Sequence, residues 1–127
     1  MLELKDSTFG DTFPFAPHYV DTGTAKIHYA DEGKGDPVLM LHGDPTWGYL
    51  WRKFIPAISE RRRVIVPDHM GMGKSSVPGT PNPYLLRHHI GNLERLVSAL
   101  GLSGITLVAH DWGGPVGMGF AVRHTDL

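Results

Sequence analysis

The sequence predicts an α/β fold in which an antiparallel pair of strands at one edge leads into parallel strands, with helices on both faces. Three observations support this prediction. Apolar runs and helical patterns alternate along the chain. The later apolar runs are near-continuous, as expected of parallel strands covered on both faces. The 127 residues, 41% of them hydrophobic, suffice for one domain with a buried core.

The expected strands are of two kinds. Residues 18–20 and 26–31 alternate weakly around the turn-rich segment 21–24, which predicts the antiparallel edge pair. The remaining strands are expected at residues 38–41, 64–66 and 105–109, because these segments are almost wholly apolar. No internal repeat or interdomain linker interrupts the pattern.

The clearest expected helix spans about residues 83–100. Its apolar face consists of Leu86, Ile90, Leu93 and Val97. Asn82 can cap its first turn, Pro83 suits the first helical position, and Gly101 can adopt the left-handed conformation that ends a helix. We expect a shorter helix over 49–58 despite Pro56, and a third from about 113 through 120 towards 124.

Composition excludes several classes of protein. Twelve basic and thirteen acidic residues give a formal charge of -1, so nucleic acid is not expected as a partner. The absence of cysteine excludes disulfides and a thiolate nucleophile. The first residues do not resemble a signal peptide, and no apolar run approaches the roughly 18 residues of a membrane span. We therefore expect a cytoplasmic protein without membrane contact.

The ends of the predicted parallel strands carry the candidate chemistry, because reactive groups gather at the carboxyl edge of such sheets. The third such strand ends in Ala109-His110-Asp111-Trp112-Gly113. Small residues two before and two after Asp111 would permit a sharp strand-to-helix bend that exposes its carboxylate, and a carboxylate can attack carbon to form an ester. The alternative is that Asp111 caps the following helix, as aspartate often does.

A second strand end, His42-Gly43-Asp44-Pro45, could place the backbone N–H of Asp44 opposite that of Trp112. Two such donors would form an oxyanion hole. Taken alone, Gly-Asp-Pro is an ordinary turn.

Three segments together resemble the haloalkane dehalogenases of the α/β-hydrolase superfamily, with matching order and spacing from about residue 13 to 127. They are residues 41–52, 66–75 and 107–117. The resemblance implies that Asp111 displaces halide from an alkyl carbon and that the Trp112 indole holds the halide. It also implies that the amides of Asp44 and Trp112 stabilise the later oxyanion. A small alkyl halide would be the substrate, with no cofactor and no metal.

Two departures from the family pattern matter. Many members carry asparagine where Asp44 stands, and its amide is a second halide donor, whereas a carboxylate repels the anion. Another branch of the family carries an acidic residue there and takes its second donor, a tryptophan, from the cap. The resemblance therefore implies that Asp44 indicates that branch or weakened halide binding. In the family, the cap domain, the triad acid and the water-activating histidine lie beyond the position of Leu127, and none of the eight histidines matches that base. Residues 1–127 are thus expected to be the N-terminal portion of an α/β-hydrolase core domain, incomplete for turnover.

Other interpretations remain open. The same aspartate chemistry could open an epoxide, or the chain could be a non-enzymatic module that associates with itself or with a complementing chain through an exposed sheet edge. Gly73-Lys74-Ser75 imitates the end of a P-loop, but Asp68 stands where that pattern requires glycine. His88 and His89 are adjacent on a helix and predict a solvated face, not a metal pair.

Overall fold

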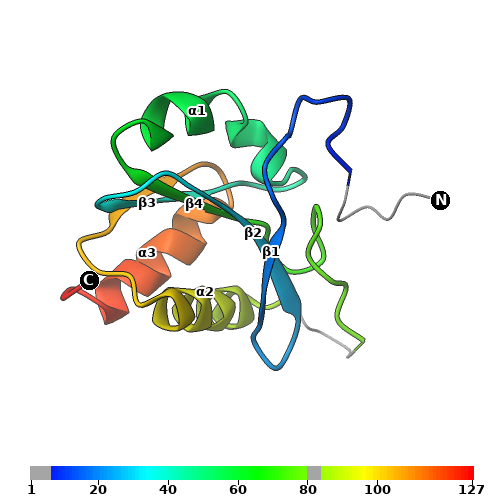
Figure 1. Cartoon of the computed structure of the whole chain (residues 1–127). Helices are drawn as coiled ribbons and strands as arrows, with labels where there is room; N and C mark the ends of the chain where they lie inside the picture. Colours follow the sequence, from blue (N-terminus) through cyan, green and yellow to red (C-terminus); the bar gives the residue numbers. More distant parts are fainter. Residues whose placement is uncertain (1–6, 80–83) are drawn as a thin grey trace.

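The computed structural model describes residues 7–79 and 84–127, which form a five-stranded sheet with helices against both faces (Figure 1). The sheet order is β1-β2-β4-β3-β5. The strands are β1 (His18–Asp21), β2 (Lys26–Glu32), β3 (Pro37–Leu41), β4 (Arg63–Pro67) and β5 (Thr106–Ala109). β2 pairs antiparallel with both β1 and β4, whereas β3 runs parallel to β4 and to β5. The predicted fold class is confirmed.

The helices form two layers around the sheet. They are the 3₁₀ helix η2 (Gly48–Trp51) and the α-helices α1 (Phe54–Ser59), α2 (Leu86–Leu100) and α3 (Gly113–Arg123). Figure 1 shows α1 on one side of the sheet and α2 and α3 on the other. This arrangement covers the central strands on both faces, which explains why their sequences do not alternate.

β3 shows how the two layers are held together. All five of its residues are buried. Leu39 and Leu41 pack in the apolar cluster that contains α2, while Val38 and Met40 pack in the cluster that contains Ile55 of α1. Successive side chains of a strand point to opposite faces, so one strand fills both halves of the core.

The prediction of one continuous helix over residues 49–58 is wrong. The structure has the 3₁₀ turn η2, a short break and then α1. Pro56 explains the restart, because in α1 it occupies the third position. Proline is tolerated in the first turn, where its missing N–H has no partner to lose, but it would disrupt the interior of a longer helix.

The long helix ends where it was expected to end but begins later. Gly101 follows α2 in the left-handed conformation with φ of 61°, and its N–H bonds to carbonyls of the last turn. Leu85, with an extended backbone, precedes the helix. Asn82 and Pro83, expected to start it, lie outside the described residues.

β5 forms the edge of the sheet opposite β1, since it pairs only with β3. Thr106 and Ala109 are exposed. Next to this edge, α3 exposes Met118 and Val122. In the described ranges, no helix combines the length and apolar character needed to cross a membrane.

Candidate active site

The candidate site lies where β3 and β5 end together. The parallel register pairs Leu41 with Ala109, and the N–H of His110 donates to the carbonyl of Leu41 at 3.1 Å. The loops that follow the two strands therefore start at the same edge of the sheet. One loop carries Asp44 and the other carries Asp111.

Asp111 lies on a sharp bend between β5 and α3. Its φ of 54° is in the left-handed region, which non-glycine residues rarely adopt. The bend requires close approach on both sides. A Cβ at Gly113 would lie 2.6 Å from the carbonyl oxygen of Leu41, and a Cβ at Gly43 would lie 2.4 Å from the Cβ of Asp111. Glycine at both positions lets the two loops approach each other. The sequence had predicted that a small residue is needed at position 113.

The Asp111 carboxylate is exposed, yet one of its oxygens is firmly held. Oδ2 accepts the backbone N–H of Asp44 at 3.1 Å and that of Trp112 at 2.6 Å. Oδ1 has no hydrogen-bond partner among the residues described. Trp112 occupies the N-cap position of α3 without a side-chain cap bond, and the helical N–H that Asp111 accepts is that of Trp112 itself, not one further into the helix as in an ordinary cap. The structure therefore brings Asp44, Trp112 and Asp111 together at one carboxylate oxygen.

These contacts also set the charge of Asp111. The hydrogen bond from the Asp44 amide, followed by that from Trp112, lowers the pKa of the Asp111 carboxyl below its usual value. Such bonds favour the charged form. Asp111 is therefore a carboxylate at neutral pH, with one oxygen bound and the other facing outward.

The side chains of Asp44 and Trp112 differ in environment. Trp112 is half-buried against the cluster that contains α2, and its indole N–H makes no hydrogen bond to any described residue. Asp44 is exposed and precedes a cis peptide bond to Pro45. Its hydrogen bond to Asp111 is made by the backbone N–H.

A group of buried histidines under the loops was not predicted from the sequence. The rings of His42 and His69 are 4.1 Å apart, and that of His89 is 5.6 Å from His69. Burial lowers the pKa of all three, in the case of His69 to about 3. They are neutral at physiological pH. His42 directly follows β3 and His69 lies two residues after the end of β4, which is the one signal that could have indicated their proximity.

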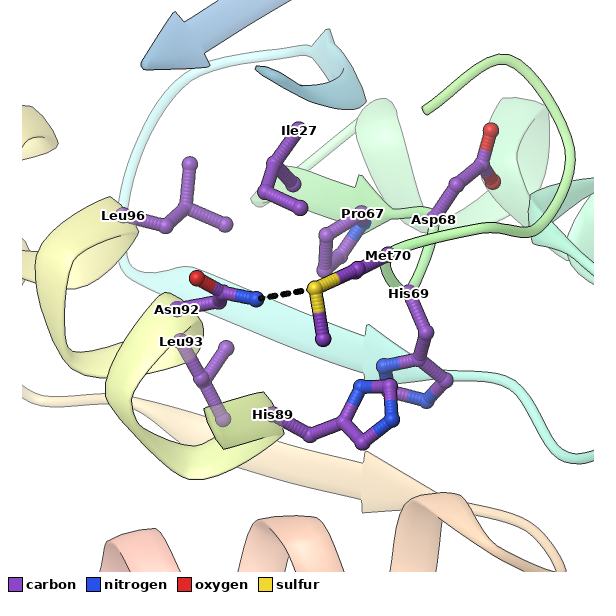
Figure 2. Close-up of a pocket in the computed structure, with 9 residues that line it drawn as sticks. All are labelled: Ile27, Pro67, Asp68, His69, Met70, His89, Asn92, Leu93 and Leu96. Carbon is purple, nitrogen blue, oxygen red and sulfur yellow. Dashed lines mark hydrogen bonds between the residues drawn. The ribbon is translucent and has the colours of Figure 1, made fainter. Parts of the chain in front are cut away.

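A small cavity lies beside this group, enclosed by β2, the loop after β4 and α2 (Figure 2). Its volume is about 20 Å³, enough for a single water molecule. Figure 2 shows the rings of His69 and His89 at one end and the bond from Asn92 to the sulfur of Met70 across it. The cavity is too small for an organic substrate.

The described part of the chain contains no group of three or more side chains that could hold a metal ion. His88 is half-buried and His89 is buried at 3% exposure, so the expected solvated face is wrong for His89. The segment 73–75 forms a turn whose Lys74 and Ser75 are buried, and no helix begins there.

Comparison with known proteins gives a family. The family model described as "alpha/beta hydrolase fold" matches residues 36–127. A cis-3-alkyl-4-alkyloxetan-2-one decarboxylase of Xanthomonas campestris is 46% identical over 88% of this chain and 41% of its own length. A haloalkane dehalogenase of Psychrobacter cryohalolentis is 37% identical over 99% of this chain and 45% of its own length.

Solved structures give the same result. A haloalkane dehalogenase from Paraglaciecola agarilytica, described as tetrameric, superimposes with a TM-score of 0.85 at 38% identity, covering 91% of this chain and 41% of that one. An epoxide hydrolase of Vigna radiata has a TM-score of 0.81 at 36% identity, covering 88% and 36%. The chain thus spans about two fifths of the length of these relatives.

Proposed function

The chain belongs to the α/β-hydrolase fold family, and from that premise we propose that it supplies the nucleophile and the oxyanion hole of a hydrolase most like a haloalkane dehalogenase. The observation that carries the proposal is the Asp111 carboxylate. Two amides hold Oδ2, while Oδ1 faces outward without a partner in the described residues. A carboxylate held in this way is ionised, oriented and accessible to an electrophile.

The first step follows from this geometry. Oδ1 attacks the carbon that bears the halogen, a C–O bond forms, and the halide leaves with the electron pair of the C–X bond. We assign the role of halide donor to the Trp112 indole N–H, because it has no partner in the described residues and Trp112 is adjacent to Asp111. The exposed Asp44 carboxylate weakens halide binding through charge repulsion.

The second step uses the same amides. Oδ2 becomes the carbonyl oxygen of the alkyl ester, and attack by water at that carbonyl turns it into an oxyanion. The N–H groups of Asp44 and Trp112 already point at this oxygen and stabilise the developing charge. No histidine ring bonds to the Asp111 carboxylate within residues 7–79 and 84–127. We propose that a group other than these histidines takes the proton of the attacking water. Collapse of the oxyanion then breaks the bond between the ester carbon and Oδ1 and releases the alcohol, which takes up that proton.

Exposure of the 127-residue chain to 1,2-dibromoethane tests the first step. Intact-mass analysis should detect a bromoethyl ester that accumulates, and Asp111→Asn should abolish it. Asp126→Asn, which changes another exposed carboxylate, is the matched control and should react like the unsubstituted chain. A folded chain that forms no adduct would favour a non-enzymatic module. An adduct that survives Asp111→Asn would mean that another group is alkylated.

A second candidate function is decarboxylation of an oxetan-2-one. It is favoured by the 46% identity to a decarboxylase of that class, above the 37% found for the dehalogenase. The four-membered lactone, like an epoxide, offers a strained carbon–oxygen bond to the same carboxylate. A cis-3,4-dialkyl oxetan-2-one, an epoxide and an alkyl bromide should be offered in parallel. Release of carbon dioxide and alkene would identify the decarboxylase, and a hydroxyalkyl ester the epoxide hydrolase.

We also propose that the chain self-associates through β5. The outer edge of this strand forms no ladder within the described residues, and the adjacent α3 exposes 63% of Met118 and 71% of Val122. An open edge beside apolar side chains favours pairing with a second copy. Analytical ultracentrifugation should detect dimers or larger species, and Val122→Lys should reduce them. A monodisperse monomer would contradict the proposal.

A further inference from the structure

The peptide that joins Gly43 to Asp44 is held at both ends. Its N–H, which belongs to Asp44, donates to Oδ2 of Asp111 at 3.1 Å. Its carbonyl oxygen, which belongs to Gly43, accepts Nδ1 of His42 at 2.7 Å and the N–H of Thr46 at 3.2 Å. Because a peptide unit is planar with its C=O and N–H opposed, fixing the oxygen also fixes the direction of the N–H.

His42 can hold the carbonyl only in one tautomer. Its Nε2 accepts the backbone N–H of His69 at 2.8 Å, so the ring proton must be on Nδ1. Nε2 of His69 donates in turn to the carbonyl of His42 at 2.8 Å. The two residues thus form a closed pair that joins the loop after β3 to the loop after β4. Their exposed fractions are 0% and 6%.

The neutral state of the pair matters for this arrangement. Burial lowers the pKa of both rings, to about 3 for His69. A protonated His42 would direct an N–H from Nε2 at the N–H of His69, and the two donors would repel each other. Neutral His42 instead accepts on one side and donates on the other.

We propose that His42 and His69 are positioning residues that orient the Gly43–Asp44 peptide so that its N–H faces the carboxylate oxygen of Asp111. His69 selects the tautomer of His42, and His42 holds the carbonyl of the oxyanion-hole peptide. The catalytic meaning of this assignment rests on the proposed function. The orientation itself does not, because it can be measured in the unreacted chain.

Two substitutions of His42 separate positioning from packing. An asparagine amide takes the place of Nδ1 of histidine, so His42→Asn keeps the bond to the Gly43 carbonyl. A glutamine amide takes the place of Nε2, so His42→Gln keeps only the contact with His69. His18→Gln on β1, where the ring stacks on Tyr29, is the control for loss of a histidine elsewhere.

The first measurement is the pKa of Asp111. NMR measures it from the change of the Asp44 and Trp112 amide resonances with pH. His42→Gln should raise this pKa towards that of a free aspartate, because the Asp44 amide no longer faces Oδ2. His42→Asn and His18→Gln should leave it near the value of the unsubstituted chain. Equal changes in both His42 variants, or no change in His42→Gln, would overturn the proposal.

The second measurement uses the alkyl ester. Its cleavage by added hydroxylamine passes through an oxyanion, so His42→Gln should slow cleavage tenfold or more, and His42→Asn should restore most of the rate. If the unsubstituted chain forms no ester, the proposed function fails while the pKa comparison still decides the positioning claim. If the ester forms and His42→Gln cleaves it at the normal rate, the positioning claim fails alone.

A third measurement needs no substitution, and it decides the matter should His42→Gln fail to fold. NMR of the chain labelled with ¹⁵N-histidine reports which ring nitrogen carries the proton. His42 should be the Nδ1–H tautomer. The Nε2–H tautomer would overturn the proposal, because Nδ1 could not then donate to Gly43.

Discussion

Asp68 and Asp111 both follow parallel strands at the same edge of the sheet, but their carboxylates have opposite fates. Asp68 is fully buried and every oxygen is bonded. Oδ1 accepts the N–H of Gly48 at 2.7 Å, and Oδ2 accepts the N–H of Lys74 and Nδ1 of His28, each at 2.9 Å. Asp111 is exposed and has one bonded oxygen. A carboxylate is available for chemistry when part of its hydrogen-bonding capacity remains unused.

The backbone around each aspartate produces this difference. The loop after β4 folds back over Asp68, and a Cβ at Gly73 would lie 2.5 Å from Oδ2 of Asp68. After β5, the left-handed residue Asp111 is followed almost at once by α3, so the segment after this strand does not fold back over the carboxylate. The same substitution at the two aspartates should therefore have different effects on stability.

The largest expected effect is on stability at Asp68. In Asp68→Asn the new NH₂ group replaces one bonded oxygen and faces a backbone N–H, that of Gly48 or that of Lys74, and the buried negative charge is lost. We expect the free energy of unfolding to fall by about 3 kcal/mol or more. Asp111→Asn should change it by less than about 0.5 kcal/mol, because asparagine tolerates positive φ and its oxygen can accept both amides. Urea unfolding measures both, and equal losses would refute the distinction.

Acid should lower the free energy of unfolding, because the buried histidines near Asp111 are neutral in the folded chain. Burial lowers the pKa of His69 from 6.5 to about 3. Between these values the unfolded chain binds a proton that the folded chain excludes, so stability falls as pH falls, by up to about 1.4 kcal/mol per pH unit. Urea unfolding from pH 7.5 to 5 measures the slope. His69→Gln keeps a donor for the His42 carbonyl but does not titrate, and its slope should be shallower. An unchanged slope would exclude His69 as the cause.

A smaller effect is expected from closing the gap beside Asp111. The Cβ of Gly43→Ala would lie 2.8 Å from Oδ2 of Asp111, so the carboxylate must move away from the Asp44 amide. We expect a loss of about 1–2 kcal/mol in unfolding free energy and a higher pKa for Asp111. Gly91→Ala is the control, because position 91 is open and lies within α2, where alanine should add up to about 1 kcal/mol. A normal Asp111 pKa in Gly43→Ala would show that the carboxylate is not confined there.

The sequence predicted the strands well because their position depends on local composition. Apolar runs at 38–41 and 64–66 need cover on both faces wherever they occur, and the structure extends each by only one or two residues. The interrupted helix at Pro56 was missed because whether a proline lies in the first turn or in the interior depends on where the helix starts. That start is set by packing on Ile55, which is fully buried.

The candidate site was predictable only in part. Asp111 stood out because small residues surround it and because its neighbours resemble a known family. The role of Asp68 depends on His28, forty residues earlier, and the histidine pair depends on a bond from the backbone N–H of His69 to the ring of His42, 27 residues earlier. No local pattern carries such contacts. They arise because the sheet brings segments that are distant in sequence next to each other.

The backbone N–H of residue 44 bonds to Asp111, while the side chain of this residue is exposed. The two halves of this residue can therefore change independently. Under the proposed function, amide, carboxylate or longer polar groups at this position would change the affinity for the leaving anion without disturbing the N–H that faces Asp111. Such a residue allows selectivity for the leaving group to diverge between relatives while the means of stabilising the intermediate stays constant.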